Sequence, residues 1–165
     1  MAAALLLLAV GCSGGPGKPT TLPTLTPTAT PTPTPTATVS DLEAATNVVR
    51  QYYALLNQLP ISMDSRGIES LMTSRCPCRQ QLAAIAEARS RGEHYIDHVR
   101  LVSLTPVRDS SRQISVLVEY DADRGGLVDE HGRTVTSAAP HKAVKRLFRV
   151  TRQAGRWLIS EIGSA

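Results

Sequence analysis

The sequence predicts one α+β domain at residues 41–165, in which helices come first and an antiparallel sheet follows. Two observations carry this prediction. Up to Gly92, apolar residues recur at steps of three and four, which is typical of one face of a helix. After Gly92 they alternate with polar residues, which is typical of half-buried strands. The segment has the size of one ordinary domain.

The first expected helix has the clearest pattern in the chain. It opens at Ser40 with Glu43 three residues later, which is a capping-box pair, and Pro60 is expected to end it. Shorter helices are expected around residues 68–72 and after Pro77, because proline suits a first helical turn. The apolar face of the first helix consists of Leu42, Ala45, Val48, Val49, Tyr52, Leu56 and Leu59.

The alternating pattern predicts several strands in the second half of the chain. Pro106 is expected to close the first of them, and His94 and His98 would share one of its faces. A weaker hairpin is expected to pair residues 127–128 with 134–135, between glycine-rich turn signals. The longer strands are expected over residues 95–104, 114–120, 144–150 and 157–162.

A segment rich in proline and threonine precedes the domain. Residues 14–40 consist mostly of Pro, Thr, Ala and Gly. Proline lacks the amide donor and fixes φ, so neither a helix nor a sheet is expected here. The segment also has too few large apolar groups to offset its chain entropy by burial. We therefore expect residues 12–40 to form a disordered, extended linker.

The N-terminal residues resemble an export signal. Residues 2–10 are apolar but too few to span a bilayer as a helix, which takes about 20 residues. Their end, Ala9-Val10-Gly11-Cys12, resembles the lipobox of bacterial lipoproteins. The resemblance implies a signal peptide at residues 1–11 and a lipidated Cys12 that anchors the protein on the extracytoplasmic face of the cell membrane. The alternative is a plain secretory signal with a chance cysteine.

The order of the expected elements resembles a known fold. A long helix, shorter helices and several strands end in Gly155-Arg156-Trp157-Leu158-Ile159-Ser160-Glu161-Ile162. Residues 41–165 thereby resemble the nuclear-transport-factor-2-like (SnoaL-like) cone fold, which implies a curved sheet wrapped around the helices and a conical pocket. With the lipobox, the linker and Cys76-Pro77-Cys78, the chain also resembles actinobacterial lipoproteins of unknown function.

Cys76 and Cys78 are the two cysteines beyond Cys12. The surroundings outside the membrane are oxidising, so an even pair favours a disulfide. The bridge would be either a local staple or a redox-labile pair, and the staple is favoured because no thioredoxin-like pattern surrounds it. A metal is not expected at this pair, because no further Cys or His lies close in the sequence.

No catalytic motif stands out. Ser-His-Asp, phosphate-loop and paired-carboxylate patterns are absent from the sequence. Tyr53, Asp97, His98 and Asp129 could face a conical pocket, but no spacing selects them for proton transfer. We therefore expect no catalytic residue, no metal and no cofactor. The histidines are expected to be half-exposed sheet residues: His94, His98, His131 and His141.

The net charge is +4, and basic residues gather near the C-terminus. One interpretation is attraction to anionic headgroups or cell-wall polymers. The other, which we favour, is a solvated face balanced by acidic residues across neighbouring strands. A nucleic-acid partner is not expected, because the interleaved aromatic residues of a stacking surface are missing. The basic residues are Lys142, Lys145, Arg146, Arg149, Arg152 and Arg156.

Three functions remain open for the domain. The favoured one is a non-catalytic module that docks an envelope protein, and the alternative is a carrier of an apolar small molecule or lipid. A SnoaL-like enzyme is the third. A filled cone would favour docking, whereas a cavity with apolar walls and one or two buried polar groups would favour the carrier. A buried acid–base pair in a wet pocket would favour the enzyme.

Overall fold

The computed structural model describes residues 39–165, so the predicted signal peptide, Cys12 and the linker before residue 39 lie outside the described residues. Within residues 39–165, no helix is both long and apolar enough to cross a membrane. All helices of this part precede the strands. They are α1 (Val39–Leu56), α2 (Leu59–Ser62), α3 (Arg66–Ser70), the 3₁₀ turn η1 (Pro77–Arg79) and α4 (Gln80–Ser90).

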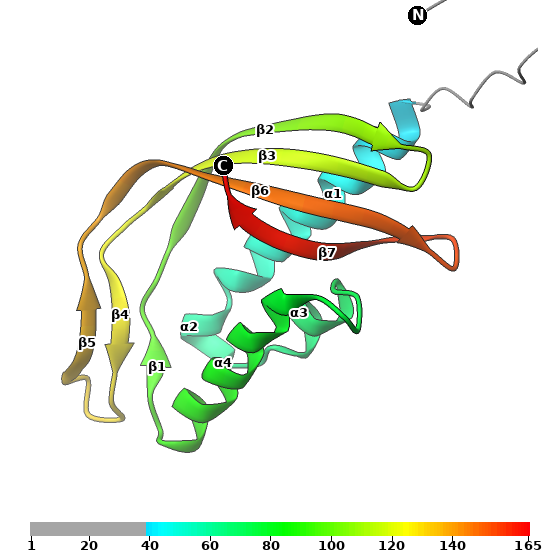
Figure 1. Cartoon of the computed structure of the whole chain (residues 1–165). Coiled ribbons are helices and arrows are strands. Elements are labelled where there is room, and N and C mark those ends of the chain that lie inside the picture. Colours follow the sequence, from blue (N-terminus) through cyan, green and yellow to red (C-terminus); the bar gives the residue numbers. More distant parts are fainter. Residues whose placement is uncertain (1–38) are drawn as a thin grey trace, which may run out of the picture. The chain divides into compact units, whose positions relative to one another are not determined.

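The strands of residues 94–164 form two antiparallel sheets (Figure 1). The larger sheet has the order β2-β3-β6-β7 and the smaller one the order β1-β4-β5. Figure 1 shows that the β4–β5 hairpin continues from β3, returns into β6 and bends away from the larger sheet. The strands are β1 (His94–Tyr95), β2 (Val99–Ser110), β3 (Gln113–Ala122), β4 (Gly125–Val128), β5 (Thr134–Ala138), β6 (His141–Gln153) and β7 (Arg156–Ser164).

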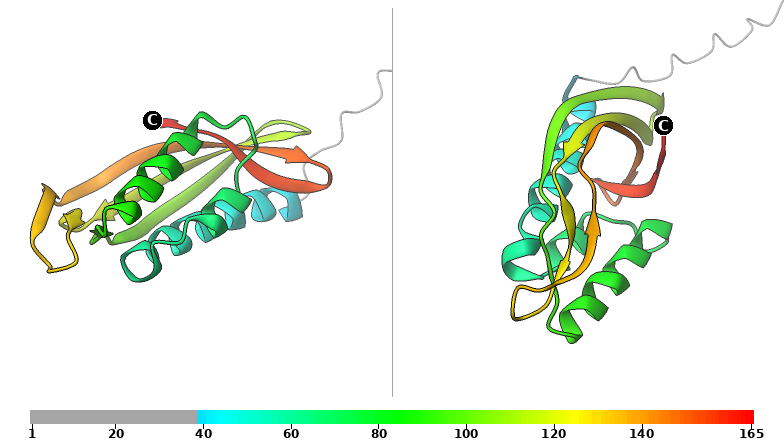
Figure 2. Two further views of the ribbon diagram at one scale, coloured as in Figure 1. Left: turned by 90° about the horizontal axis from the view of Figure 1, so that it is seen from below. Right: turned by 90° about the vertical axis from the view of Figure 1, so that its left-hand side faces the viewer.

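The larger sheet curves, and α1 packs along it (Figure 2). Successive residues of a strand point to opposite faces, so every second residue of β3 and β6 faces α1. The register places Ile114 opposite Val150 and Val116 opposite Phe148, and all four side chains are fully buried. Burial of each such side chain contributes about 1.5–3 kcal/mol, so this row holds α1 against the sheet.

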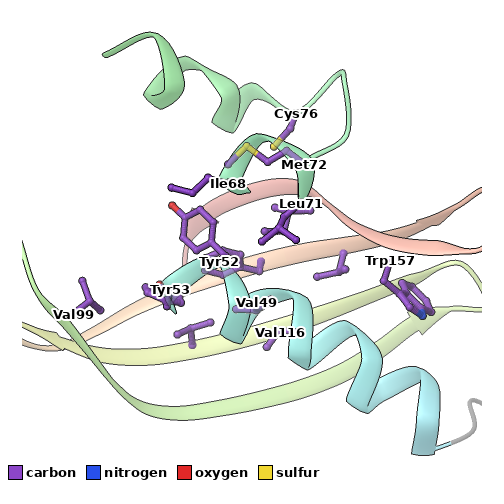
Figure 3. Packing of buried hydrophobic residues seen from close by; sticks show 14 of the residues in the cluster. Val49, Tyr52, Tyr53, Ile68, Leu71, Met72, Cys76, Val99, Val116 and Trp157 are labelled. Atoms are coloured by element: carbon purple, nitrogen blue, oxygen red, sulfur yellow. The ribbon is translucent and has the colours of Figure 1, made fainter. Parts of the chain in front are cut away.

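Loop residues between α3 and η1 close the other side of the core. Figure 3 shows Leu71, Met72 and Cys76 above α1 and beside Tyr52. Met72 forms a parallel bridge with Ile159 of β7. The Ile159 amide donates to the Leu71 carbonyl, and the Thr73 amide donates to the Ile159 carbonyl, each at 2.8 Å. These bonds fix the loop that leads into η1.

The predicted order of helices followed by antiparallel strands is confirmed, and so is Pro77 in a first helical turn, but the predictions for Pro60 and Pro106 were wrong. The first helix ends at Leu56, and Pro60 lies in the first turn of α2, where its missing amide has no helical partner to lose. Pro106 does not close a strand, because β2 continues to Ser110. β2 is an edge of its sheet, where a residue without an amide donor is tolerated.

The strand predicted over residues 95–104 is divided between the two sheets. β1 ends at Tyr95 and pairs with β4, whereas β2 begins at Val99 and pairs with β3. His94 lies in β1 and His98 lies in the link between the strands, so the two histidines do not share a strand face. A three-residue link changes the direction of the chain there, and alternation alone could not reveal it.

Candidate functional site

A cavity of about 530 Å³ opens between α1, η1, the start of α4 and the inner face of β2, β3, β6 and β7. A second hollow of about 250 Å³ adjoins it, and the two share four lining residues. We call them the larger and the smaller chamber. The shared residues are Leu56, Gln81, Val99 and Tyr120.

Two adjacent tyrosines of α1, Tyr52 and Tyr53, line the larger chamber. Figure 3 shows both among the buried side chains of the core. Consecutive helical residues point about 100° apart, so Tyr52 and Tyr53 reach different neighbours. The Tyr52 hydroxyl donates to Gln81 Oε1 of α4 at 3.1 Å. The Tyr53 ring packs against Tyr120 of β3 and Phe148 of β6, with centroid distances of 5.4 and 5.6 Å. The walls of the chamber are therefore partly aromatic, and its tyrosine rings carry hydroxyl groups.

These phenols keep their protons at neutral pH. Burial raises the pKa of both Tyr52 and Tyr53, and the nearby charge of Arg146 opposes only a small part of that rise. Within residues 40–165, the Tyr53 hydroxyl forms no hydrogen bond, so its donor is available to a bound molecule. Both tyrosines can therefore donate hydrogen bonds to a ligand or to neighbouring oxygens, but they are poor general bases.

Arg146 brings a positive charge into the larger chamber. It lies opposite Val118 in the register, and Val118 is fully buried on the inner face of β3. The Arg146 side chain is only partly exposed, and its Nη1 donates to Ser164 Oγ of β7 at 3.2 Å. No acidic residue lines this chamber within the described part of the chain. An anion is the ligand charge that this arrangement favours.

The basic residues predicted near the C-terminus therefore lie on both faces of β6 and do not form one basic face. Lys145 and Arg149 are exposed on the outer face, and Arg149 forms an ion pair with Glu161. Lys142 is exposed as well and lies 3.6 Å from the largely buried Asp121. Arg146 and Arg152 both fall on the inward row of β6. Arg152 is exposed near the end of the strand and pairs with Asp41 of α1, so only Arg146 of these basic residues lines the chamber. The signal for this was the row Val144, Arg146, Phe148 and Val150.

Asp97 contributes an acid to the smaller chamber. Its Oδ1 accepts a hydrogen bond from the Gly126 amide at 3.1 Å, and burial raises the pKa of the carboxyl while this bond opposes the rise. A Cβ on Gly125 would lie 1.7 Å from Asp97 Oδ1, so this contact requires glycine. Gly126 has a φ of +142°, which also favours glycine. The glycine pair at the start of β4 therefore positions the carboxyl.

The other residues named from the sequence have different positions. Cys76 and Cys78 are joined by a disulfide with Cα atoms 5.1 Å apart; Cys76 is buried in the core and Cys78 lines the larger chamber. His98 is exposed, 3.8 Å from Asp123, and Asp129 binds Arg133 in the β4–β5 turn. Neither lines a chamber. Within residues 40–165, no three His, Cys, Asp or Glu side chains form a group that could hold a metal.

No protein-family model matches the chain, and no curated protein matches it. Several solved structures do. The intermembrane-space region of the chloroplast protein ARC6 aligns with a TM-score of 0.57 at 15% identity, over 76% of this chain and 98% of that one. A putative aromatic ring hydroxylase from Novosphingobium aromaticivorans aligns with a TM-score of 0.54 at 14% identity, over 77% and 89%.

An uncharacterized protein with a cystatin-like fold from Caulobacter vibrioides also matches. Its TM-score is 0.50 at 10% identity, and the alignment covers 73% of this chain and 84% of that chain. The predicted α+β cone fold is confirmed. Identities at this level show the fold alone, and one fold of this kind serves unrelated functions. The function of this chain therefore has to be argued from its own cavity.

Proposed function

We propose that the domain binds a small, largely apolar ligand in the two-chamber cavity. The observation that supports this is the cavity itself, because it stays open inside a curved sheet whose adjoining core is fully packed. Ligand sites are typically concave, of about 300–1,000 Å³, with apolar walls and a few polar groups that fix orientation. The larger chamber has this composition: aromatic and aliphatic walls, phenol hydroxyls, one amide and one guanidinium.

The same polar groups favour binding over catalysis. The phenols have raised pKa values, and the guanidinium of Arg146 carries a permanent charge. Groups of this kind donate hydrogen bonds and do not accept a proton at neutral pH. The one carboxyl of the cavity, Asp97, lines the smaller chamber and already accepts a backbone hydrogen bond. We therefore propose a non-catalytic carrier or sensor of the ligand.

We further propose that this domain works at the extracytoplasmic face of the cell membrane. The lipobox at Ala9–Cys12 supports the anchor, and the Pro/Thr linker supports a tether between the anchor and the domain. The two structural neighbours with the highest TM-scores reported above are an intermembrane-space region and a putative aromatic ring hydroxylase. Because these neighbours are so different, the functional proposal is based on the cavity.

Binding of a neutral apolar probe tests the proposal. Phenylnaphthylamine fluoresces in apolar surroundings, and we expect the full chain to bind it and enhance its emission. Leu56 lines both chambers, so Leu56→Trp fills the space between them and should weaken probe binding at least about tenfold. Ala54→Trp is the matched control, since Ala54 is exposed on the same helix. Equal binding by both variants, or no binding by the unmodified chain, would contradict the proposal.

Docking of an envelope protein is a second candidate, and the β4–β5 arm favours it. All five residues of β5 are exposed, Val135 to 47%, and β5 is an edge of the smaller sheet. An extended segment of a partner could add a strand to such an edge. A photo-crosslinker at Val135 should then capture a protein in the envelope, whereas one at the exposed Ile61 of α2 should not. Equal labelling from both positions would count against docking by the arm.

A further inference from the structure

We propose that the cavity selects an amphipathic monoanion, an apolar chain or ring that ends in a carboxylate, and that Arg146 binds the carboxylate. This inference rests on the proposed ligand-binding function and names the class of ligand. It follows from the direction of the Arg146 side chain, from the lack of an acidic partner for it, and from the distribution of polar groups along the cavity.

The direction follows from the strand. In β6 the inward positions around Arg146 hold Val144, Phe148 and Val150, and the last two are fully buried. Arg146 occupies the same row, opposite Val118, and lines the larger chamber. A charged side chain in an apolar inward row loses hydration, and this loss is unfavourable unless another group compensates for it. Its presence in the row therefore calls for a functional explanation.

The electrostatics separate Arg146 from the other arginines of residues 40–165. Nine of them have a carboxylate within ion-pair distance. Arg146 has none, and it is the one partly buried arginine of the described part of the chain without such a partner. A single positive charge without a counter-ion suits a monoanion. The remaining arginines without a carboxylate partner are all exposed: Arg75, Arg89, Arg112, Arg124 and Arg156.

Hydrogen-bond donors around Arg146 fit a carboxylate. Guanidinium offers five donors in a planar fork, and the Ser164 hydroxyl accepts from only one of them. Tyr53 lines the same chamber, and its hydroxyl has no hydrogen-bond partner in residues 40–165. Arginine binds a carboxylate through two parallel bonds, which are stronger than bonds between neutral groups. Phe148, Ile162 and Leu56 supply apolar contacts for the rest of the ligand.

The opposite polarity of the smaller chamber gives the ligand a direction. Arg146 pairs with Val118, whereas Val99, two residues after Asp97, pairs with Ala122. Four residues of strand separate these positions along β3, which corresponds to about 14 Å. An anion is therefore attracted to the Arg146 end and repelled from the Asp97 end. The apolar body would point from Arg146 toward Leu56 and Val99, which both chambers share.

Competition with bound phenylnaphthylamine tests the inference on the full chain at neutral pH. The competitors are dodecanoate, dodecanol and dodecyl phosphate, which share one chain and differ in the head group. We expect the unmodified chain to prefer dodecanoate to dodecanol by about tenfold or more, since a hydrogen bond to a charged group is worth that factor. Arg146→Gln should abolish this preference, and Arg146→Lys should keep part of it. Lys145→Gln, with the same charge change on the outer face, should leave it unchanged.

The possible results separate the two proposals. Equal binding of dodecanoate and dodecanol, or a preference that Arg146→Gln retains, would overturn the carboxylate inference while the apolar cavity stands. Stronger binding of dodecyl phosphate than of dodecanoate would overturn it in favour of phosphate. Failure of the chain to bind phenylnaphthylamine at all would contradict the proposed function itself. Arg146→Lys keeps the test valid should Arg146→Gln fail to fold.

Discussion

Replacing Arg146 by methionine should make the protein without ligand more stable. The substitution removes one hydrogen bond to Ser164, a loss of about 0.5–1.5 kcal/mol. It also removes a partly buried cation that lacks a carboxylate partner within residues 40–165. Full burial of an ion costs several kcal/mol, so partial burial costs about 2 kcal/mol. Methionine keeps the apolar stem in place. The net gain is about 1 kcal/mol.

Urea denaturation of the full chain measures this gain as a higher midpoint at an unchanged slope. The matching rise in Tm is roughly 3–6 °C for a domain of this size. Lys145→Met is the control, and it should change stability by less than about 0.5 kcal/mol because Lys145 is exposed. A loss of 1 kcal/mol or more in Arg146→Met would refute the reasoning, since it would make Arg146 a residue that the fold needs.

The same variant should lose stabilisation by the ligand. A ligand at a hundredfold excess over its Kd stabilises a protein by about 2.7 kcal/mol. Dodecanoate should therefore raise the urea midpoint of the unmodified chain and of Lys145→Met, but raise that of Arg146→Met much less. An equal rise in all of them would place the carboxylate away from Arg146. Together, the two measurements distinguish a residue kept for binding from one kept for stability.

Three further predictions concern other parts of the molecule. Asp97→Asn should change the pH dependence of stability. Because the folded pKa of Asp97 is raised, the contribution of this carboxyl to stability is lost as pH rises above 3.8 through the folded pKa, and urea midpoints across that range would show whether the variant escapes this loss. Gly126→Ala should destabilise the domain by at least about 1 kcal/mol, because its Cβ would lie 2.1 Å from the Thr136 carbonyl oxygen; an unchanged melting temperature would contradict the contact. Cys12→Ser should prevent incorporation of a fatty-acid label and release the protein from membranes, and a membrane-bound, labelled variant would sink the anchor proposal.

Periodicity was sufficient for the fold because one face of α1 and the inner rows of β3 and β6 are buried in the middle of these elements. The face of α1 and the inward rows of β3 and β6 follow their expected spacing. The errors lie where a local rule depends on tertiary position. Pro106 is compatible with a strand only because β2 is an edge. At the break between β1 and β2, Asp97 accepts a hydrogen bond from the Gly126 amide of β4, which lies 29 residues further along the chain. Neither fact can be read from neighbouring residues.

The candidate site was harder to predict because the residues of the larger chamber alone come from seven elements of secondary structure and match no motif. Tyr53 and Asp97 were named among four pocket candidates, and they line different chambers, whereas His98 and Asp129 line neither. No pattern in the sequence indicated that Gln81 and Tyr120 would line the cavity. They line both chambers only because the fold brings residues of α4 and β3 to the same cavity.

Arg146 did give a signal, through a conflict between two patterns. Counted by charge it belongs with Lys145 and Arg149, but counted by alternation it belongs with Phe148 and Val150. The backbone decides such a conflict, because a strand cannot turn one side chain outward without shifting its register. A cation that the register forces inward is a violation of apolar patterning, and such violations are expected at functional sites. In a half-buried strand of this kind, an arginine on the apolar row without a carboxylate partner is therefore a stronger indication of a binding site than a cluster of basic residues beside it.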